Sequence, residues 1–365
     1  YQNISMKKIK RNWMSQTHNY LFLDAIKNKP IDRTPIWIMR QAGRYLPEYI
    51  NLKNKAGGFM GLVRNPELAC EITLQPLERF SLDSAIVFSD ILVVSEMLGI
   101  NLSFIEKKGP MFDKTIRSEK DLHALNINEY DTDILDYVFD TIKLLKNELH
   151  GKKPLIGFIG SPWTVATYIV EGNSSKVFTN VLEMMKNNPT LLHKILDILT
   201  DISIKYLNKQ ILSGIDVAMI FDTWGGLLND TEYKEFSLSY IDKIKASIKN
   251  KDIPLIYYIR ETGKKIHIIK NMNIDVLGID SSTNIGVIKQ HVKNKYALQG
   301  NLDVEVLKQD EQTMREAVEN ILTSYNSPSG HVFNLGTGIT PDINPDKVKM
   351  LIDILADISP KYNVK

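Results

Sequence analysis

The stretch "LIGFIGSPWTVATY", Leu155–Tyr168, contains the two signals that decide the fold. Its first half is a short apolar run, which predicts a buried strand over Leu155–Ile159. Ser161 then offers a side chain that can cap a helix, and Pro162 suits the first helical position. We therefore expect a helix to begin here and to run through Tyr168. A strand followed at once by a helix is one βα unit.

The same pattern recurs along the chain. Eight apolar runs bounded by turn residues are predicted as strands: Ile36–Met39, Ala85–Ser89, Leu155–Ile159, Val217–Phe221, Leu255–Ile259, Val276–Ile279, Ala297–Gly300 and Val332–Leu335. Segments with helical periodicity separate them, one of which opens with a cap and a proline at Asn65 and Pro66. Residues 90–154 must hold additional elements. Eight such units predict an α/β fold, a single (β/α)8 TIM barrel domain over residues 1–365, with an open doubly wound sheet as the alternative.

Composition excludes several classes of function. The 45 Lys and Arg residues nearly balance the 43 Asp and Glu residues, without a long block of either sign, so nucleic-acid binding is not expected. No window approaches the roughly 18 consecutive apolar residues of a membrane span. Cys70 is the one cysteine, and the seven histidines are scattered, so we expect neither a disulfide nor a bound metal.

The chain begins with "YQNISMKKIKRNW", which lacks an initiator methionine. This start predicts a processed product, with residues 1–20 as a loosely ordered N-terminal extension.

In a barrel of this kind, the active site is built from the loops that follow the strands. The residues at the predicted strand ends are Arg40 with Arg44, Ser89–Asp90, Gly160–Ser161, Asp222–Thr223, Arg260–Glu261, Asp280–Ser281, Asn301, and Asn334 with Gly336–Thr337. Arg40 and Arg44 share one loop, in which Gly43 would allow a tight turn. Their guanidinium groups suit a ligand with several carboxylates or phosphates, although solvated or Asp-paired arginines are the alternative.

Three further segments could contact such a ligand. Asp90 would present a carboxylate above an apolar floor of Ile86 and Phe88, or else would cap the next helix. Thr164 and Tyr168 share one face of their predicted helix, where their hydroxyls could reach a ligand, although a buried tyrosine is the commoner case.

Two glycine-containing loops are less specific. Thr223, within "FDTWGG", could donate to an anion, or this turn could serve only as a cap. "NLGTGIT" resembles a phosphate-binding loop, but the preceding loop, "QGNLD", offers only one glycine.

Two long segments resemble a known family. "IWIMRQAGRYLPEY" and "GFIGSPWTVATYIVEG" are similar to the signature segments of the uroporphyrinogen decarboxylase family, and "FSDIL", "FDTWGG" and "NLGTGITPDINPD" follow in the right order. The similarity runs from Arg33 to Asp346. It implies a distorted barrel, a homodimer, and the conversion of uroporphyrinogen III to coproporphyrinogen III, in which four acetate side chains become methyl groups. No metal or organic cofactor is implied.

The resemblance also implies roles for individual positions. The substrate, a polyanionic tetrapyrrole, would be bound by Arg40, Gln41, Ala42, Gly43, Arg44, Asp90, Tyr168, Thr223 and Thr337, with Asp90 and Arg40 as the catalytic residues. Thr337 stands where the family typically has histidine. Its hydroxyl can bind a carboxylate but cannot titrate near neutral pH.

Two other functions and two locations stay open. A cobalamin- or zinc-dependent methyltransferase could share the barrel, although the chain lacks the expected pattern of His and Cys ligands. A tetrapyrrole-binding protein without turnover is suggested by Thr337 alone. The basic start "MKKIKR", taken with the resemblance, favours a plastid-type organelle over the cytoplasm.

Overall fold

The computed structural model describes residues 20–363 except for residues 107, 126–131 and 176. The predicted N-terminal extension therefore lies outside the described residues, apart from Tyr20. Within the described part, seven parallel strands form one curled sheet in the order β1-β4-β5-β6-β7-β8-β9. These strands are β1 (Ala85–Ile86), β4 (Leu155–Gly160), β5 (Val217–Asp222), β6 (Leu255–Ile259), β7 (Val276–Ile279), β8 (Ala297–Gln299) and β9 (His331–Val332). Because neighbours in the sheet follow the chain order without a reversal, the doubly wound alternative is wrong.

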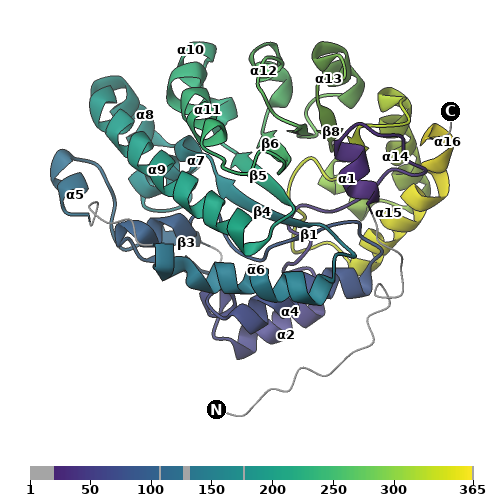
Figure 1. The fold of residues 1–365 in the computed structure, drawn as a ribbon, viewed down its shortest axis with the longest axis horizontal. Coiled ribbons are helices and arrows are strands. Elements are labelled where there is room, and N and C mark those ends of the chain that lie inside the picture. The colour runs from purple at the N-terminus through teal and green to yellow at the C-terminus, as the bar shows by residue number, and fades with distance from the viewer. Residues whose placement is uncertain (1–19, 107, 126–131, 176, 364–365) are drawn as a thin grey trace.

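Helices cover the outer side of the curled sheet (Figure 1). The α-helices are α1 (Leu21–Ile26), α2 (Pro47–Lys55), α3 (Phe59–Val63), α4 (Pro66–Arg79), α5 (Glu119–His123), α6 (Asp136–Leu149), α7 (Pro162–Glu171), α8 (Thr179–Asn187), α9 (Pro189–Ser213), α10 (Asp230–Tyr233), α11 (Ser239–Ala246), α12 (Thr262–Ile269), α13 (Ile285–Val292), α14 (Glu311–Tyr325), α15 (Pro345–Ile358) and α16 (Pro360–Asn363). Asn65 and Ser161 cap α4 and α7 as predicted, by accepting the backbone N–H groups of Leu68 and Thr164.

The predicted additional elements lie between β1 and β4. They include the antiparallel pair β2 (Leu102–Ile105) and β3 (Gly109–Phe112), the helices α5 and α6, and the 3-10 helices η2 (Val93–Leu98) and η3 (Thr132–Leu135).

The segment predicted as the first strand closes the barrel without forming a regular strand. Ile36 makes one isolated parallel bridge with Phe333, just after β9. On its other side, the Asp83 backbone N–H donates to the Ile36 carbonyl over 2.8 Å, just before β1. The segment therefore lies between the two edges of the sheet, and the fold is a distorted (β/α)8 barrel.

The prediction of a regular strand over Ile36–Met39 is wrong because this segment bonds to a side chain near the other end of the chain. The Met39 N–H donates to the Asn334 side chain at 2.9 Å, so it is not available to a strand ladder. Arg40 then adopts a positive φ of 66°, which ends the extended backbone.

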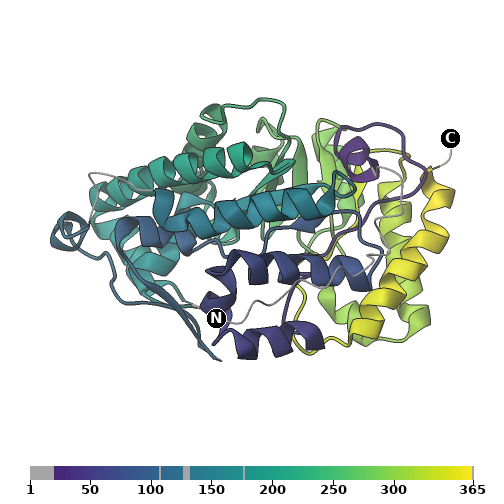
Figure 2. The same ribbon diagram turned by 60° about the horizontal axis from the view of Figure 1, so that its bottom comes forward.

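Two hydrophobic clusters form the core, because successive side chains of each strand point to opposite faces. On β4, Ile156 and Phe158 belong to the inner cluster, whereas Leu155 and Ile159 pack outward against the helices. Helix α1 also contributes to the inner cluster, and it contacts β8 and β9. Figures 1 and 2 both place α1 beside the C-terminal helices.

Among the described residues, the structure contains no helix that is both long enough and apolar enough to cross a membrane.

Candidate active site

The loop after Ile36 is shaped by Arg40 and Gln41. The Gln41 N–H donates to the Ile38 carbonyl over 2.8 Å, and Arg40 occupies the left-handed region between them. The Gln41 side chain is 1% exposed, accepts the Ile38 N–H and donates to the Ser84 carbonyl. This side chain therefore holds the loop in place. Arg40 carries the left-handed backbone of this loop, and a turn begins at Gly43, whose carbonyl accepts the Leu46 N–H over 3.0 Å.

Three arginines near the C-terminal ends of the strands have no hydrogen-bond or ion-pair partner in the part of the chain that the structure describes. Among the eight described arginines, five are bonded: Arg33 to Asp83, Arg64 to Glu96, Arg79 to Glu48, Arg117 to the carbonyls of Val170 and Glu171, and Arg315 to Asp357. Arg40, Arg44 and Arg260 make no hydrogen bond or ion pair with another described residue. The alternative of Asp-paired arginines is therefore wrong for Arg40 and Arg44.

Asp90 follows β1 and lies near Arg40. One of its carboxylate oxygens accepts the Leu92 N–H over 2.8 Å, and the other has no hydrogen-bond partner among the described residues. Burial raises the pKa of Asp90, while the Leu92 N–H and the positive charge of Arg40 act in the opposite direction. The carboxylate is thus held in a partly buried position, next to one unpaired guanidinium group.

The apolar surroundings of Asp90 differ from the prediction. Ile86 packs with the inner cluster, as expected for a residue inside the barrel. Phe88 instead packs edge to face against Tyr49 and Phe59, with ring centroids 5.8 and 5.4 Å away. Since β1 ends at Ile86, the strand alternation that would turn Phe88 inward does not continue.

Tyr168 lies where several of these groups meet. Its ring centroid is 6.4 Å from that of Trp224, and the Arg260 guanidinium lies 5.4 Å from the same Trp224 ring. Burial raises the pKa of Tyr168, the Asp90 carboxylate adds to the rise, and the charges of Arg40 and Arg260 oppose it. Tyr168, Asp90, Arg40 and Arg260 therefore surround one region, although they follow different strands.

Thr164 does not share this region with Tyr168. Its hydroxyl donates to Asp222 over 3.2 Å and accepts the Trp224 N–H over 3.2 Å. The side chain is fully buried, so the prediction that it reaches a ligand is wrong.

Asp222 is a buried hub that the sequence did not reveal. Its carboxylate accepts hydrogen bonds from four hydroxyl groups, those of Ser161, Thr164, Ser237 and Tyr257, over distances of 2.5, 3.2, 2.7 and 2.8 Å. Burial raises the pKa of Asp222, although all four donors favour the charged form. These bonds join β5 to α7, to β6 and to the π-helical turn η5 (Lys234–Leu238).

Asp222 also fixes the loop that follows β5. Thr223, which is partly exposed, comes next in the chain, and Trp224 is held by Thr164. A Cβ atom on Gly225 would lie 2.2 Å from an Asp222 carboxylate oxygen, so only glycine fits there.

The glycines of "NLGTG" serve close packing inside the protein. A Cβ atom on Gly336 would lie 2.2 Å from the Ser281 backbone nitrogen, and one on Gly338 would lie 2.5 Å from Cδ of Arg40. The Gly336 carbonyl also accepts the Tyr258 hydroxyl over 2.9 Å. These contacts explain both glycines without a bound phosphate. Thr337, between them, is partly exposed.

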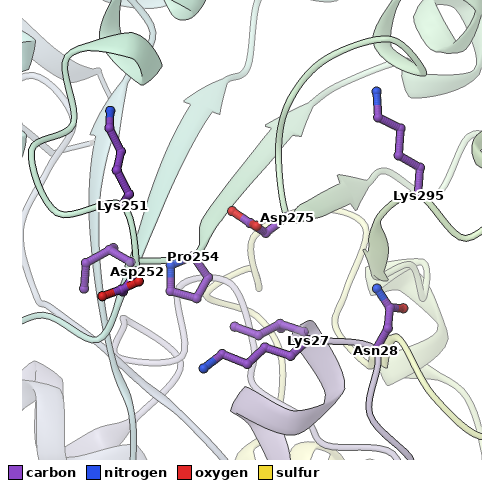
Figure 3. A pocket seen from close by; sticks show the side chains of 9 residues that line it. Lys27, Asn28, Lys251, Asp252, Pro254, Asp275 and Lys295 are labelled. Atoms are coloured by element: carbon purple, nitrogen blue, oxygen red, sulfur yellow. The ribbon is translucent and has the colours of Figure 1, made fainter.

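A hollow of about 320 Å³ lies at the opposite end of the barrel (Figure 3). It is lined by Ile26, Lys27, Asn28, Lys251, Asp252, Ile253, Pro254, Asp275 and Lys295. Figure 3 shows the Lys251 and Lys295 side chains extending away from Pro254, so the lysines do not converge on one point. Because this hollow is next to the N-terminal ends of β6, β7 and β8, it is separate from the arginines and Asp90.

Potential metal ligands do not gather at the site. Among the described residues, no group of three or more His, Cys, Asp and Glu side chains could hold a metal ion.

Comparisons with known proteins relate the chain to one family. The family model described as Uroporphyrinogen decarboxylase (URO-D) matches residues 17–358. A protein of Cellvibrio japonicus named uroporphyrinogen decarboxylase is 45% identical, over 96% of this chain and 99% of its own length. A protein of the same name from Hydrogenovibrio crunogenus is 46% identical, over 96% of this chain and all of its own length.

The fold has a solved counterpart. A methyltransferase from Methanosarcina mazei superposes with a TM-score of 0.77 at 21% identity, over 93% of this chain and 98% of its own. This likeness concerns the fold alone. The family match and the two bacterial relatives, in contrast, span nearly the whole sequence, and the chain belongs to the uroporphyrinogen decarboxylase family.

Proposed function

We propose that the protein decarboxylates the four acetate side chains of uroporphyrinogen III, giving coproporphyrinogen III and CO2. The relatives named uroporphyrinogen decarboxylase support this proposal at 45–46% identity. The observation that carries it is the placement of the Asp90 carboxylate beside Arg40, whose guanidinium group has no hydrogen-bond or ion-pair partner among the described residues. Such an arrangement is incomplete without an anionic ligand.

The substrate matches this arrangement chemically. It carries eight carboxylates around its edge and four pyrrole N–H groups at its centre. Arg40 and Arg44 can each bind a carboxylate through a guanidinium fork. The free oxygen of Asp90 can accept pyrrole N–H groups, because an ionised carboxylate has several acceptor positions.

Decarboxylation without a cofactor needs an electron sink. Protonation of a pyrrole on carbon makes the ring a cation, which accepts the electron pair when the bond to the departing CO2 breaks. The exocyclic methylene carbon that remains then takes up a proton, and the ring carbon releases the proton that it had accepted. Each decarboxylation therefore consumes one proton overall, releases one CO2 and leaves a methyl group. A fixed Asp90 carboxylate stabilises the developing cation, and such preorganised electrostatics is typically the largest catalytic effect.

Arg40 would contribute by position and charge. With a pKa above about 12, an arginine is poorly matched to act as a general acid, although its position can compensate. Arg40 can hold the reacting acetate near Asp90 while its charge favours the ionised form of that carboxyl.

Hydroxyl groups would complete the binding of the carboxylates. Because burial raises the pKa of Tyr168, this hydroxyl stays protonated at neutral pH and can donate a hydrogen bond. Thr223 and Thr337, both partly exposed, can donate in the same way.

Anaerobic incubation with uroporphyrinogen III tests the proposal. Products separated by their number of carboxylates should include species with seven, six, five and finally four. An Asp310→Asn variant serves as a control, because Asp310 only caps α14 and asparagine caps equally well. Binding without any loss of carboxylates would identify a tetrapyrrole-binding protein and overturn the proposal.

A homodimer and a location are also proposed. The dimer follows from the family pattern, and light scattering of the purified protein, expected to give twice the chain mass of 41.6 kDa, would test it. A plastid-type location stays a prediction, which the bacterial relatives named above do not support. Imaging of the protein in the cells that make it would decide between an organelle and a diffuse signal.

A further inference from the structure

We propose that Arg260 binds a propionate carboxylate of the substrate, on the side of the barrel opposite Arg40, and so anchors the substrate and every intermediate. This inference rests on the proposed function. It assigns a role to a residue that the sequence placed at a strand end without a role.

The order of the strands places Arg260 across the barrel from Arg40. Arg40 follows the segment that closes the ring between β9 and β1, and Arg260 follows β6. Along the sheet, β6 is the fourth strand from that segment in either direction. The two guanidinium groups therefore belong to opposite sides of the ring, which suits a flat macrocycle whose carboxylates point outward all round.

Electrostatic effects on two tyrosines show that both arginines act on the interior of this ring. Burial raises the pKa of Tyr258, and the charges of Arg260 and Arg40 both oppose the rise. The same two charges oppose the rise in the pKa of Tyr168. A ligand seated between the two arginines would lie in a field of positive charge from both sides.

Arg260 is held in place but is not neutralised. Its guanidinium lies 5.4 Å from the centre of the Trp224 ring, a cation–π contact that leaves the donor groups free. The nearest acid in the chain, Glu261, pairs instead with Lys264 over 2.8 Å. Of the eight described arginines, five have partners, so a free and oriented arginine at the mouth of the barrel indicates a partner supplied by the ligand.

The chemistry of the reaction favours propionate over acetate as that partner. All four acetates become methyl groups, so an anchor on an acetate would be lost during the reaction. The four propionates persist in the substrate, in each intermediate and in the product. Arg40 lies beside Asp90, where an acetate reacts, whereas Arg260 is on the far side, where a lasting contact can hold the macrocycle.

The test compares Arg260→Leu with the wild-type protein, with coproporphyrinogen III as a probe because its only carboxylates are propionates. We expect the inhibition constant for coproporphyrinogen III and the KM for uroporphyrinogen III each to rise about tenfold or more, with kcat within about threefold. Arg260→Lys should recover part of the affinity, since the charge remains but the fork is lost. Arg315→Leu is the matched control, because Arg315 pairs with Asp357 on the exposed surface.

The outcomes separate the inference from the function on which it rests. If coproporphyrinogen III inhibits Arg260→Leu as strongly as it inhibits the wild type, the propionate contact is wrong, whatever happens to the KM. If the wild-type protein itself does not decarboxylate uroporphyrinogen III, the proposed function fails first. Should Arg260→Leu fail to fold, Arg260→Gln provides the same comparison with a polar side chain.

Discussion

Replacing Asp90 with asparagine should remove most of the turnover and leave the protein at least as stable as before. The two effects have opposite signs because the same charge has two roles. In the folded protein, burial raises the pKa of Asp90, so its ionised form is less favourable there than in the unfolded chain. During decarboxylation, that ionised form faces a developing cation and stabilises it.

The structure sets the size of each effect. Asparagine keeps an oxygen that can accept the Leu92 N–H, so the local turn is retained and only the charge is lost. Losing one preorganised electrostatic group typically lowers kcat by about 10²- to 10³-fold, which corresponds to about 3–4 kcal/mol. Because the pKa of Asp90 is raised in the folded protein, its ionisation lowers the free energy of unfolding. This loss of stability begins as the pH rises past the unfolded pKa of about 3.9, and it is complete above the folded pKa. At neutral pH, Asp90→Asn removes this loss of stability.

Two measurements on the same protein test this prediction. The loss of carboxylates is followed under anaerobic conditions, and the free energy of unfolding is measured with urea at pH 7. Asp310→Asn, which replaces an exposed carboxylate that caps α14, should leave the loss of carboxylates unchanged. Near-normal turnover in folded Asp90→Asn protein would refute the catalytic role, and a large loss of stability would refute the electrostatic explanation.

Three other substitutions test separate parts of the site. The charge of Arg40 lowers the pKa of Asp90, so Arg40→Gln should shift the acid limb of the pH profile of kcat/KM to higher pH; an unshifted limb would contradict this coupling. Thr337→Ala should change kcat/KM by about tenfold or less, about 1.4 kcal/mol, whereas a thousandfold fall would mean that this hydroxyl is essential. Asp222→Ala leaves four buried hydroxyls without their acceptor, so the free energy of unfolding measured with urea should fall by about 3 kcal/mol or more. A fall below about 1 kcal/mol would contradict the structural role of the Asp222 carboxylate.

The sequence was most informative where a residue's role depends on its neighbours in the chain. Buried strands such as Leu255–Ile259 and Val276–Ile279 are continuous apolar runs bounded by turn residues, and the structure places them at the predicted bounds. The cap at Ser161 depends only on the next few residues, and it was also predicted correctly.

The failures concern contacts between distant segments. Met39 donates to Asn334, and this bond, which joins positions 295 residues apart, removes a strand that the local pattern favours. Thr164 and Tyr168 share a helix face, but only the tertiary position of Asp222 turns Thr164 away from the ligand. Likewise, Arg260 differs from the bonded arginines only in having no partner, which is a property of the folded protein.

The closure of the barrel by the segment around Ile36 has a consequence for synthesis of the protein. The shape of the Arg40 loop depends on groups at the other end of the chain, Phe333, Asn334 and Gly338. A nascent chain therefore cannot form the arginine loop until the last strand has left the ribosome. Contacts between such distant positions are costly in loop-closure entropy and form slowly. A chain that ends before β9 should consequently be inert, because its own N-terminal half cannot take up the active shape alone.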